Sequence, residues 1–342
     1  MKALLAFAIL PSLFWDGGPE TAPALRNAHI DSIRVPTASV DPWLKVPGIA
    51  SEAGDPEHAV KLIVPGVDYL SYDASATHAP FIRSNGWRYL RSPGAQFFIN
   101  APGAAAALAA AEGYMFAAAP MIKTDADGLA PLGEMLAFLK TLPQERLPAL
   151  ANVGFIDDGS PASAERMNLM IVRNLLFRRL AAPDLALDLM VRPGSTDFPA
   201  AAWQNPDLLE HVVRSKLTDE KRLVRVYGSD VVIARLEGNE SELELHLLNY
   251  AAAEKHAQGV RIRVLGKWEG HKLFSFGAPN AQLADYAVAS DATEFTLPEL
   301  SSYGVVILGR FAVRQDPDKT PRTAPPKAPS APASLSQTPA AQ

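Results

Sequence analysis

The pattern of apolar residues changes at about residue 222, and this change constrains the fold more than any other feature of the sequence. Before it, apolar runs of strand length alternate with helical stretches, which is typical of parallel α/β domains. After it, short segments alternate polar and apolar residues between turn-forming residues, which is typical of antiparallel sheets. We therefore predict an α/β domain over 9–202, a connecting helix and loop over 203–221, and an all-β domain over 222–312.

Apolar runs give the clearest strands of the first domain, at 116–123, 149–156 and 185–191. Composition and helical spacing predict helices between the strands, over 75–86, 104–112, 128–141 and 161–180. Asp127 and Ser160 are the predicted caps of the last two helices. About seven or eight strands alternating with helices predict a compact or degenerate (β/α)8 TIM-like barrel, with an open doubly wound sheet as the alternative. No Gly-x-Gly-x-x-Gly motif follows a strand, which disfavours the dinucleotide-binding form of that sheet.

The second domain is predicted to be an antiparallel β-sandwich of about eight short strands. Gly228, Ser229 and Asp230 separate two apolar segments and indicate a hairpin turn. Residues 242–247 alternate polar and apolar side chains strictly, which is the pattern of a strand with one face in the core and one in water. Residues 313–342 are rich in Pro, Ala, Ser and Thr, so we expect a disordered tail.

Composition argues against several kinds of partner. The chain of 342 residues carries a net charge of −5 and no cluster of Lys and Arg, so nucleic acid is not an expected partner. It has no cysteine, which removes disulfides and thiolate chemistry. No stretch of about 20 apolar residues is present to span a membrane as a helix. The sequence leaves the oligomeric state open.

The first residues are similar to a secretory signal, because Lys2 is followed by an apolar run up to Trp15. The same run also fits the first buried strand of the fold, followed by a loop at Gly17 and Gly18. The two interpretations are compatible if residues 1–8 are the remnant of a signal peptide. We therefore expect an extracytoplasmic protein, either periplasmic or secreted.

Polar residues that directly follow the predicted strands form the candidate site, because a parallel α/β barrel carries its functional groups at the carboxyl ends of its strands. Three of them could pair as the catalytic carboxylates of a glycosidase: Asp16, Asp125 and Asp157. Others at similar positions could bind substrate: Trp15, Asp73, Asn100, Lys123 and Arg192. Asp is also a common cap and turn former at such junctions, which is the preferred interpretation for Asp127 and Asp158.

Motifs for metals, phosphates and nucleophilic serines are missing from the sequence. The seven histidines show no metal-ligand spacing. No Gly-x-Ser-x-Gly segment indicates a nucleophile elbow, and no P-loop motif is present. We therefore expect neither a metal nor a cofactor.

The order of the two domains, with the segments 223–236 and 303–308 as the start and end of the second, resembles glycoside hydrolases whose catalytic barrel is followed by a small all-β module. The resemblance covers architecture and implies a carbohydrate ligand. The commonest such families use two Glu residues at the ends of the fourth and seventh strands, whereas no Glu ends a strand predicted here. Two hypotheses follow: a glycosidase that uses paired Asp carboxylates, or an inactive protein that binds glycans or cell-surface partners.

Overall fold

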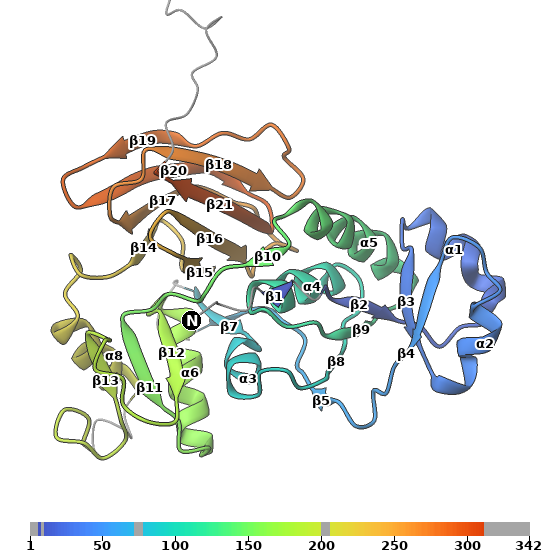
Figure 1. Cartoon of the computed structure of the whole chain (residues 1–342), viewed down its shortest axis with the longest axis horizontal. Helices are drawn as coiled ribbons and strands as arrows, with labels where there is room; N and C mark the ends of the chain where they lie inside the picture. Colours follow the sequence, from blue (N-terminus) through green and yellow to red (C-terminus); the bar gives the residue numbers. More distant parts are fainter. Residues whose placement is uncertain (1–5, 8–9, 72–77, 200–205, 311–342) are drawn as a thin grey trace, which may run out of the picture.

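The structure is a computed structural model that describes residues 6–7, 10–71, 78–199 and 206–310. An antiparallel β-sandwich lies on top of a part built from helices and parallel strands (Figure 1). The predicted tail, 313–342, lies outside the described residues, as does most of the predicted signal remnant, 1–8. Within the described residues, no helix has both the length and the apolar character needed to cross a membrane.

Six parallel strands form the larger sheet of the α/β part, in the order β4-β3-β2-β9-β8-β5. They are β2 (Ser12–Phe14), β3 (Ser32–Val35), β4 (Ala50–Ala53), β5 (Val60–Lys61), β8 (Phe97–Asn100) and β9 (Met121–Lys123). Leu13 and Ile122 on the central strands are fully buried, which explains the apolar runs in the sequence. The first strand, β2, forms within the apolar run that ends at Trp15.

A second parallel sheet has three strands, in the order β12-β11-β13. They are β12 (Phe177–Leu180), β11 (Val153–Ile156) and β13 (Leu189–Val191). The strand pairings of the described residues leave the two sheets separate, and β9 pairs directly with β2 in the larger one. The prediction of a parallel α/β part is thus confirmed, whereas a closed eight-stranded ring is not formed by these pairings.

The helices of the α/β part connect and cover these strands. They are α1 (Ala22–Asn27), α2 (Val40–Trp43), α3 (Gly86–Arg91), α4 (Ala105–Met115), α5 (Ala126–Thr141), α6 (Pro161–Val172) and α8 (Pro206–Lys216), with short 3-10 turns at Pro19–Thr21 and Thr37–Ser39. Ser160 caps α6 as predicted, because its side chain accepts a hydrogen bond from the Ser163 amide. The cap of α5 is Asp125 and not Asp127, the residue predicted.

Two helix predictions were wrong. The helix predicted to reach Leu180 ends at Val172, because Asn174 adopts a φ of +54° and the chain then forms β12 beside β11. Arg178 and Arg179 consequently lie on a strand and not on the solvated end of a helix.

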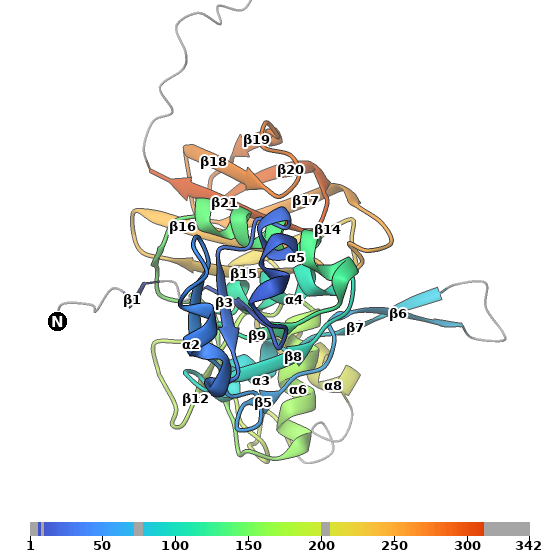
Figure 2. The same ribbon diagram turned by 90° about the vertical axis from the view of Figure 1, so that its right-hand side faces the viewer.

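Where a helix was predicted over 75–86, β6 (Gly66–Ser71) and β7 (His78–Arg83) pair as an antiparallel hairpin. Figure 2 shows these two strands extending away from the rest of the molecule. The strand predicted over 116–123 begins only at Met121, since Phe116 ends α4 and Ala117 has a φ of +54°.

The sandwich consists of eight strands in two four-stranded sheets, which confirms the predicted strand count. One sheet contains β14 (Val224–Tyr227), β17 (Ala257–Leu265), β20 (Ala292–Leu300) and β19 (Ala284–Val288) in that order. The other contains β15 (Val232–Gly238), β16 (Glu242–Asn249), β21 (Tyr303–Gly309) and β18 (Gly270–Ser275). Contrary to the prediction for 242–247, almost every residue of β16 is buried, because helix α4 contacts it.

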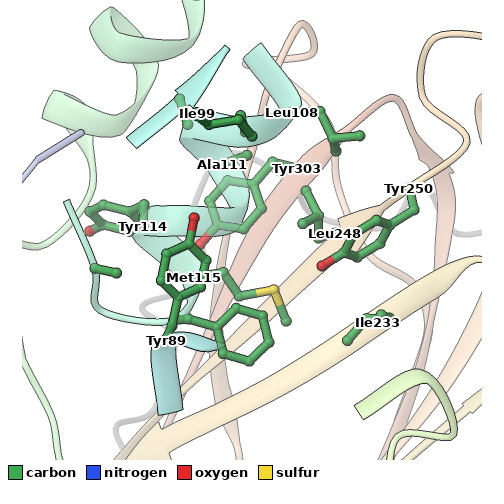
Figure 3. Close-up of a cluster of buried hydrophobic side chains, with 14 of the residues drawn as sticks. Tyr89, Ile99, Leu108, Ala111, Tyr114, Met115, Ile233, Leu248, Tyr250 and Tyr303 are labelled. Atoms are coloured by element: carbon green, nitrogen blue, oxygen red, sulfur yellow. The ribbon is translucent and has the colours of Figure 1, made fainter. Parts of the chain in front are cut away.

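Both parts of the molecule contribute to one continuous hydrophobic core. Figure 3 shows Tyr89, Leu108 and Met115 of the α/β part packed close to Leu248, Tyr250 and other side chains of the sandwich. All of these side chains are at most 5% exposed. The sandwich therefore stabilises the α/β part directly, through apolar surface that neither part could bury alone.

Replacing Ser160 by Ala is expected to lower the free energy of unfolding by about 1 kcal/mol. The substitution leaves the Ser163 amide at the start of α6 without its side-chain acceptor. Urea unfolding followed by circular dichroism would measure the change. Ser290→Ala, at an exposed position in the sandwich, is the control and should stay within about 0.5 kcal/mol of the wild type.

Candidate functional site

Asp16 and Lys123 meet at the carboxyl edge of the larger parallel sheet. Asp16 follows β2 and Lys123 ends β9, and these two strands are neighbours. The Lys123 ammonium donates a hydrogen bond to Asp16 Oδ2, and this bond lowers the pKa of the Asp16 carboxyl. Asp16 remains 54% exposed, so it is an ionised surface carboxylate with a cation beside it.

Asp125 lies at the same edge of the sheet, and its carboxylate accepts hydrogen bonds from two backbone amides. Its Oδ1 accepts hydrogen bonds from the amides of Gly103 and Gly128, both at 2.9 Å. These bonds, led by that from Gly103, lower the pKa of Asp125. The same atom thus joins the loop before α4 to the first turn of α5, which is the role of a helix cap.

Asp157 follows β11 in the smaller sheet, and its side chain is fully buried (0% exposed). Burial alone would raise its pKa, but hydrogen bonds from Arg91 and Arg179 outweigh burial and lower it. Arg91 binds both carboxylate oxygens, at 2.7 and 3.0 Å, and Arg179 Nε lies 2.9 Å from Oδ2. Asp157 is therefore an ionised carboxylate that fixes two guanidinium groups.

The structure brings some of the predicted site residues together and separates others. Asp16, Lys123 and Asp125 share one edge of the larger sheet, and Asn100 lies opposite Lys123 on the neighbouring strand β8. Asp157 belongs to the other sheet, and in Figure 1 the two sheets lie on opposite sides of α3.

The remaining predicted residues lie in three different environments. Trp15 packs against the core, and its indole N–H donates to Thr21 Oγ1 at 2.8 Å. Arg192 is exposed and follows β13. Asp73 lies outside the described residues.

A groove of about 460 Å³ runs beside α3, between β7 and α6. We call it the α3 groove, and its main lining residues are Phe81, Trp87, Arg88, Arg91, Pro161 and Glu165. Phe81 is 52% exposed, so an aromatic side chain is accessible in the groove. This groove was not predicted from the sequence, because a helix was expected where β7 carries Phe81. The closely spaced aromatic and basic residues of 81–91 were the available signal.

Asp157 contributes to this groove indirectly, by holding Arg91. Besides its two bonds to Asp157, Arg91 donates to the Ser160 carbonyl oxygen at 3.0 Å. Its guanidinium carbon lies 5.2 Å from the centre of the Trp87 ring, and that of Arg88 lies 4.4 Å from it. The groove therefore has a rigid wall in which cations stack on an aromatic ring.

A cluster of ionisable groups is buried where the sandwich covers the α/β part. Glu237 of β15 and Glu244 and His246 of β16 have ligand atoms within 4.8 Å of one another, which is a possible metal set. Two guanidinium groups already bind Glu237 Oε1, namely Arg146 Nη2 at 2.5 Å and Arg235 Nε at 3.1 Å. A divalent cation would add to this buried positive charge, so the cluster fits an ion network better than a metal site.

The protonation states within this network follow from burial. Burial lowers the pKa of His246 to about 3, so its imidazole is neutral, and Nδ1 lies 2.7 Å from the Tyr303 hydroxyl. Burial and the nearby Glu237 charge raise the pKa of Glu244 to about 7. Burial also raises the pKa of Glu237, but the charges of Arg235 and Arg146 outweigh it, and the net pKa is lowered.

No protein family and no curated protein matches the sequence. Among solved structures, α-L-fucosidase isoenzyme 2 from Paenibacillus thiaminolyticus is similar over 65% of this chain, with a TM-score of 0.51 and 9% identity. This chain spans 62% of the length of the fucosidase. A β-galactosidase from Rahnella sp. R3 matches 86% of this chain, with a TM-score of 0.32 and 10% identity. The match covers 60% of the β-galactosidase chain. The architecture of the chain is thus glycoside hydrolase-like, a statement about its fold alone.

Proposed function

We propose that this glycoside hydrolase-like chain binds carbohydrate in the α3 groove without hydrolysing it. The observation that carries the proposal is the state of the three candidate carboxylates. Asp125 caps a helix, Asp157 is fully buried between two arginines, and Asp16 is paired with Lys123. Glycosidases of the usual kind need two carboxyl groups facing one bond, about 5–10 Å apart, one of which can donate a proton. The lowered pKa of each of these residues argues against a proton donor among them.

The α3 groove supplies what a sugar-binding site needs. Ligand sites combine aromatic surface with a few fixed polar groups. Phe81 offers an open aromatic face, while Arg88 and Glu165 border it with hydrogen-bonding groups. The fixed Arg91 reduces the conformational entropy that the wall of the groove would lose on binding.

A glycosidase that uses Asp16 is the second candidate, because Asp16 is exposed at the carboxyl edge of the parallel sheet.

We also infer an extracytoplasmic location, because the start of the sequence is similar to a signal peptide and the proposed ligand is a carbohydrate. Cell fractionation tests the location, and the protein in the cytosolic fraction alone would contradict it.

The wild-type chain is expected to bind at least one glycan of a broad panel, and Phe81→Ala is expected to weaken that binding by at least about tenfold. The exposed position of Phe81 makes the change harmless to folding. Isothermal titration calorimetry measures the affinity, and a reducing-sugar assay tests for cleavage of the same glycan.

Tyr69→Ala is the matched control for Phe81→Ala. Tyr69 is 44% exposed on the same hairpin, and it pairs with Pro80, so that its side chain lies on the opposite face from Phe81. The control should bind as the wild type does. Release of reducing sugar that disappears in Asp16→Asn would replace the proposal by the second candidate.

A further inference from the structure

Three guanidinium groups line the α3 groove, and their ionic partners differ. Arg83 Nε lies 3.0 Å from Asp68 Oδ2, and Arg91 is held by Asp157. Arg88, by contrast, has no carboxylate within ion-pair distance among the described residues. Glu165, the acidic residue of the groove, is paired with Arg166 at 2.6 Å. Among the described residues, the groove therefore carries a positive charge with no carboxylate paired to it.

Arg88 is half-buried, so this unbalanced charge carries an energetic cost. Its closest polar contact is weak, with Nη1 lying 3.4 Å from Asn85 Oδ1. Burial lowers the pKa of Arg88, and the charge of Glu112 opposes this effect only in part. A partly desolvated cation is stabilised by an anion that can reach it from the groove.

The position of Arg88 is fixed by its neighbours. Its guanidinium stacks on the Trp87 ring, and a stacked guanidinium keeps its N–H groups in plane and free to donate. Asn85 behind it is fixed by Glu112, which accepts bonds from the Asn85 amide at 2.6 Å and from Nδ2 at 2.9 Å. Such a preorganised guanidinium matches a carboxylate, which it can bind through two parallel hydrogen bonds.

We propose that the α3 groove binds an acidic glycan, with a sugar carboxylate paired to Arg88 and a sugar ring resting on Phe81. This inference rests on the proposed function, since it names the class of carbohydrate that the same groove accepts. The inference depends on charge complementarity, because the ligand would supply a carboxylate to Arg88, which has no such partner in the described part of the chain. The two side chains line the same groove, which accommodates a ligand of the size of a short oligosaccharide.

Calorimetry with defined probes tests the inference. The probes are tetragalacturonate and a hyaluronan tetrasaccharide, each compared with its carboxyl-reduced neutral counterpart. The wild type is expected to bind an acidic probe at least about tenfold more tightly than its neutral counterpart. Arg88→Gln should remove this preference, and Arg88→Lys, which keeps the charge without the planar fork, should retain part of it.

Arg261→Gln is the control, because it removes a guanidinium that pairs with Glu294 on the sandwich, outside the groove. It should leave the preference unchanged. Equal binding of acidic and neutral probes, unaltered in Arg88→Gln, would overturn the acidic-ligand inference and leave the carbohydrate site standing. If neither kind of probe binds, the inference is wrong, and the broad glycan panel then decides whether the proposed function fails with it.

Discussion

Replacing Glu237 by Ala is expected to lower the free energy of unfolding by about 3–5 kcal/mol. Glu237 is 1% exposed and is the carboxylate that both Arg146 and Arg235 contact. Without it, the guanidinium groups of Arg146 and Arg235, which are 7% and 14% exposed, lose the counter-ion that they share. Guanidinium chloride unfolding monitored by circular dichroism measures the loss.

Arg146 links the ion network to helix α4 of the α/β part. Its Nη1 donates to the Tyr114 carbonyl oxygen at 2.9 Å and its Nη2 to that of Met115 at 3.3 Å, which satisfies the end of α4. Glu237 of the sandwich thus binds Arg146, and Arg146 in turn binds the end of α4.

Two further variants separate the loss of charge from the loss of volume. Glu237→Gln keeps the shape of the side chain and should lose most of the same energy, because it removes the charge. Glu240→Ala, at an exposed turn between β15 and β16, should change stability by less than about 0.5 kcal/mol. A Glu237→Ala variant as stable as Glu240→Ala would contradict the assignment of an ion network.

The wild type is expected to lose about 3 kcal/mol of stability relative to Glu244→Gln as the pH rises from about 4.5 to above 7. Burial raises the pKa of Glu244 from 4.5 to about 7, so the folded protein holds a proton in this range that the unfolded chain has released. Stability from this group is therefore fully present below the unfolded pKa and is lost as the pH rises through the folded pKa. Glutamine imitates the protonated side chain and removes this dependence.

Thermal and urea unfolding at several pH values test this expectation. The difference between the two proteins should grow between pH 5 and pH 7 and level off above about pH 8. His246, 3.8 Å from Glu244, is neutral in the folded protein and takes up a proton only on unfolding, so it affects wild type and Glu244→Gln alike and cancels in their difference. Parallel stability curves for wild type and Glu244→Gln would mean that folding does not raise the pKa of Glu244, and they would contradict this expectation.

The sequence predicted the sandwich well because most of its strands carry their own signal. β16, for example, alternates side chains along its length, and Leu243, Leu245 and Leu247 all face the core. The sequence did not reveal that the opposite face of β16 is buried as well. Glu244 and His246 look like solvent-facing residues until α4 and Arg146 cover them, and that covering is a tertiary contact.

Predictions for the α/β part were wrong where the local sequence pattern favoured another structure than the one that tertiary contacts stabilise. Apolar residues continue at helical spacing beyond Val172, but Asn174 turns the chain with a positive φ and β12 pairs with β11. The hairpin β6–β7 went unpredicted because the segment 71–79 is rich in small and polar residues of low strand propensity.

The sequence predicted where the carboxylates Asp16 and Asp125 lie, but it predicted neither their contacts nor the α3 groove. Asp16 and Asp125 do lie at the carboxyl edge of a parallel sheet, where the strand ends placed them. The ionic partners of the candidate carboxylates come from distant segments. Lys123 pairs with Asp16, and Arg91 and Arg179 pair with Asp157. Sequence spacing carries no information on such pairs, so it could not separate a reactive carboxylate from a structural one.

A crystal structure of the wild type with the oligosaccharide that binds it in solution would show directly whether the α3 groove holds carbohydrate without cleaving it. We expect an intact oligosaccharide in the α3 groove, with a sugar ring over Phe81 and all glycosidic bonds unbroken. A sugar bound instead at the edge of the larger sheet beside Asp16 and Lys123, or a cleaved product at either place, would contradict it.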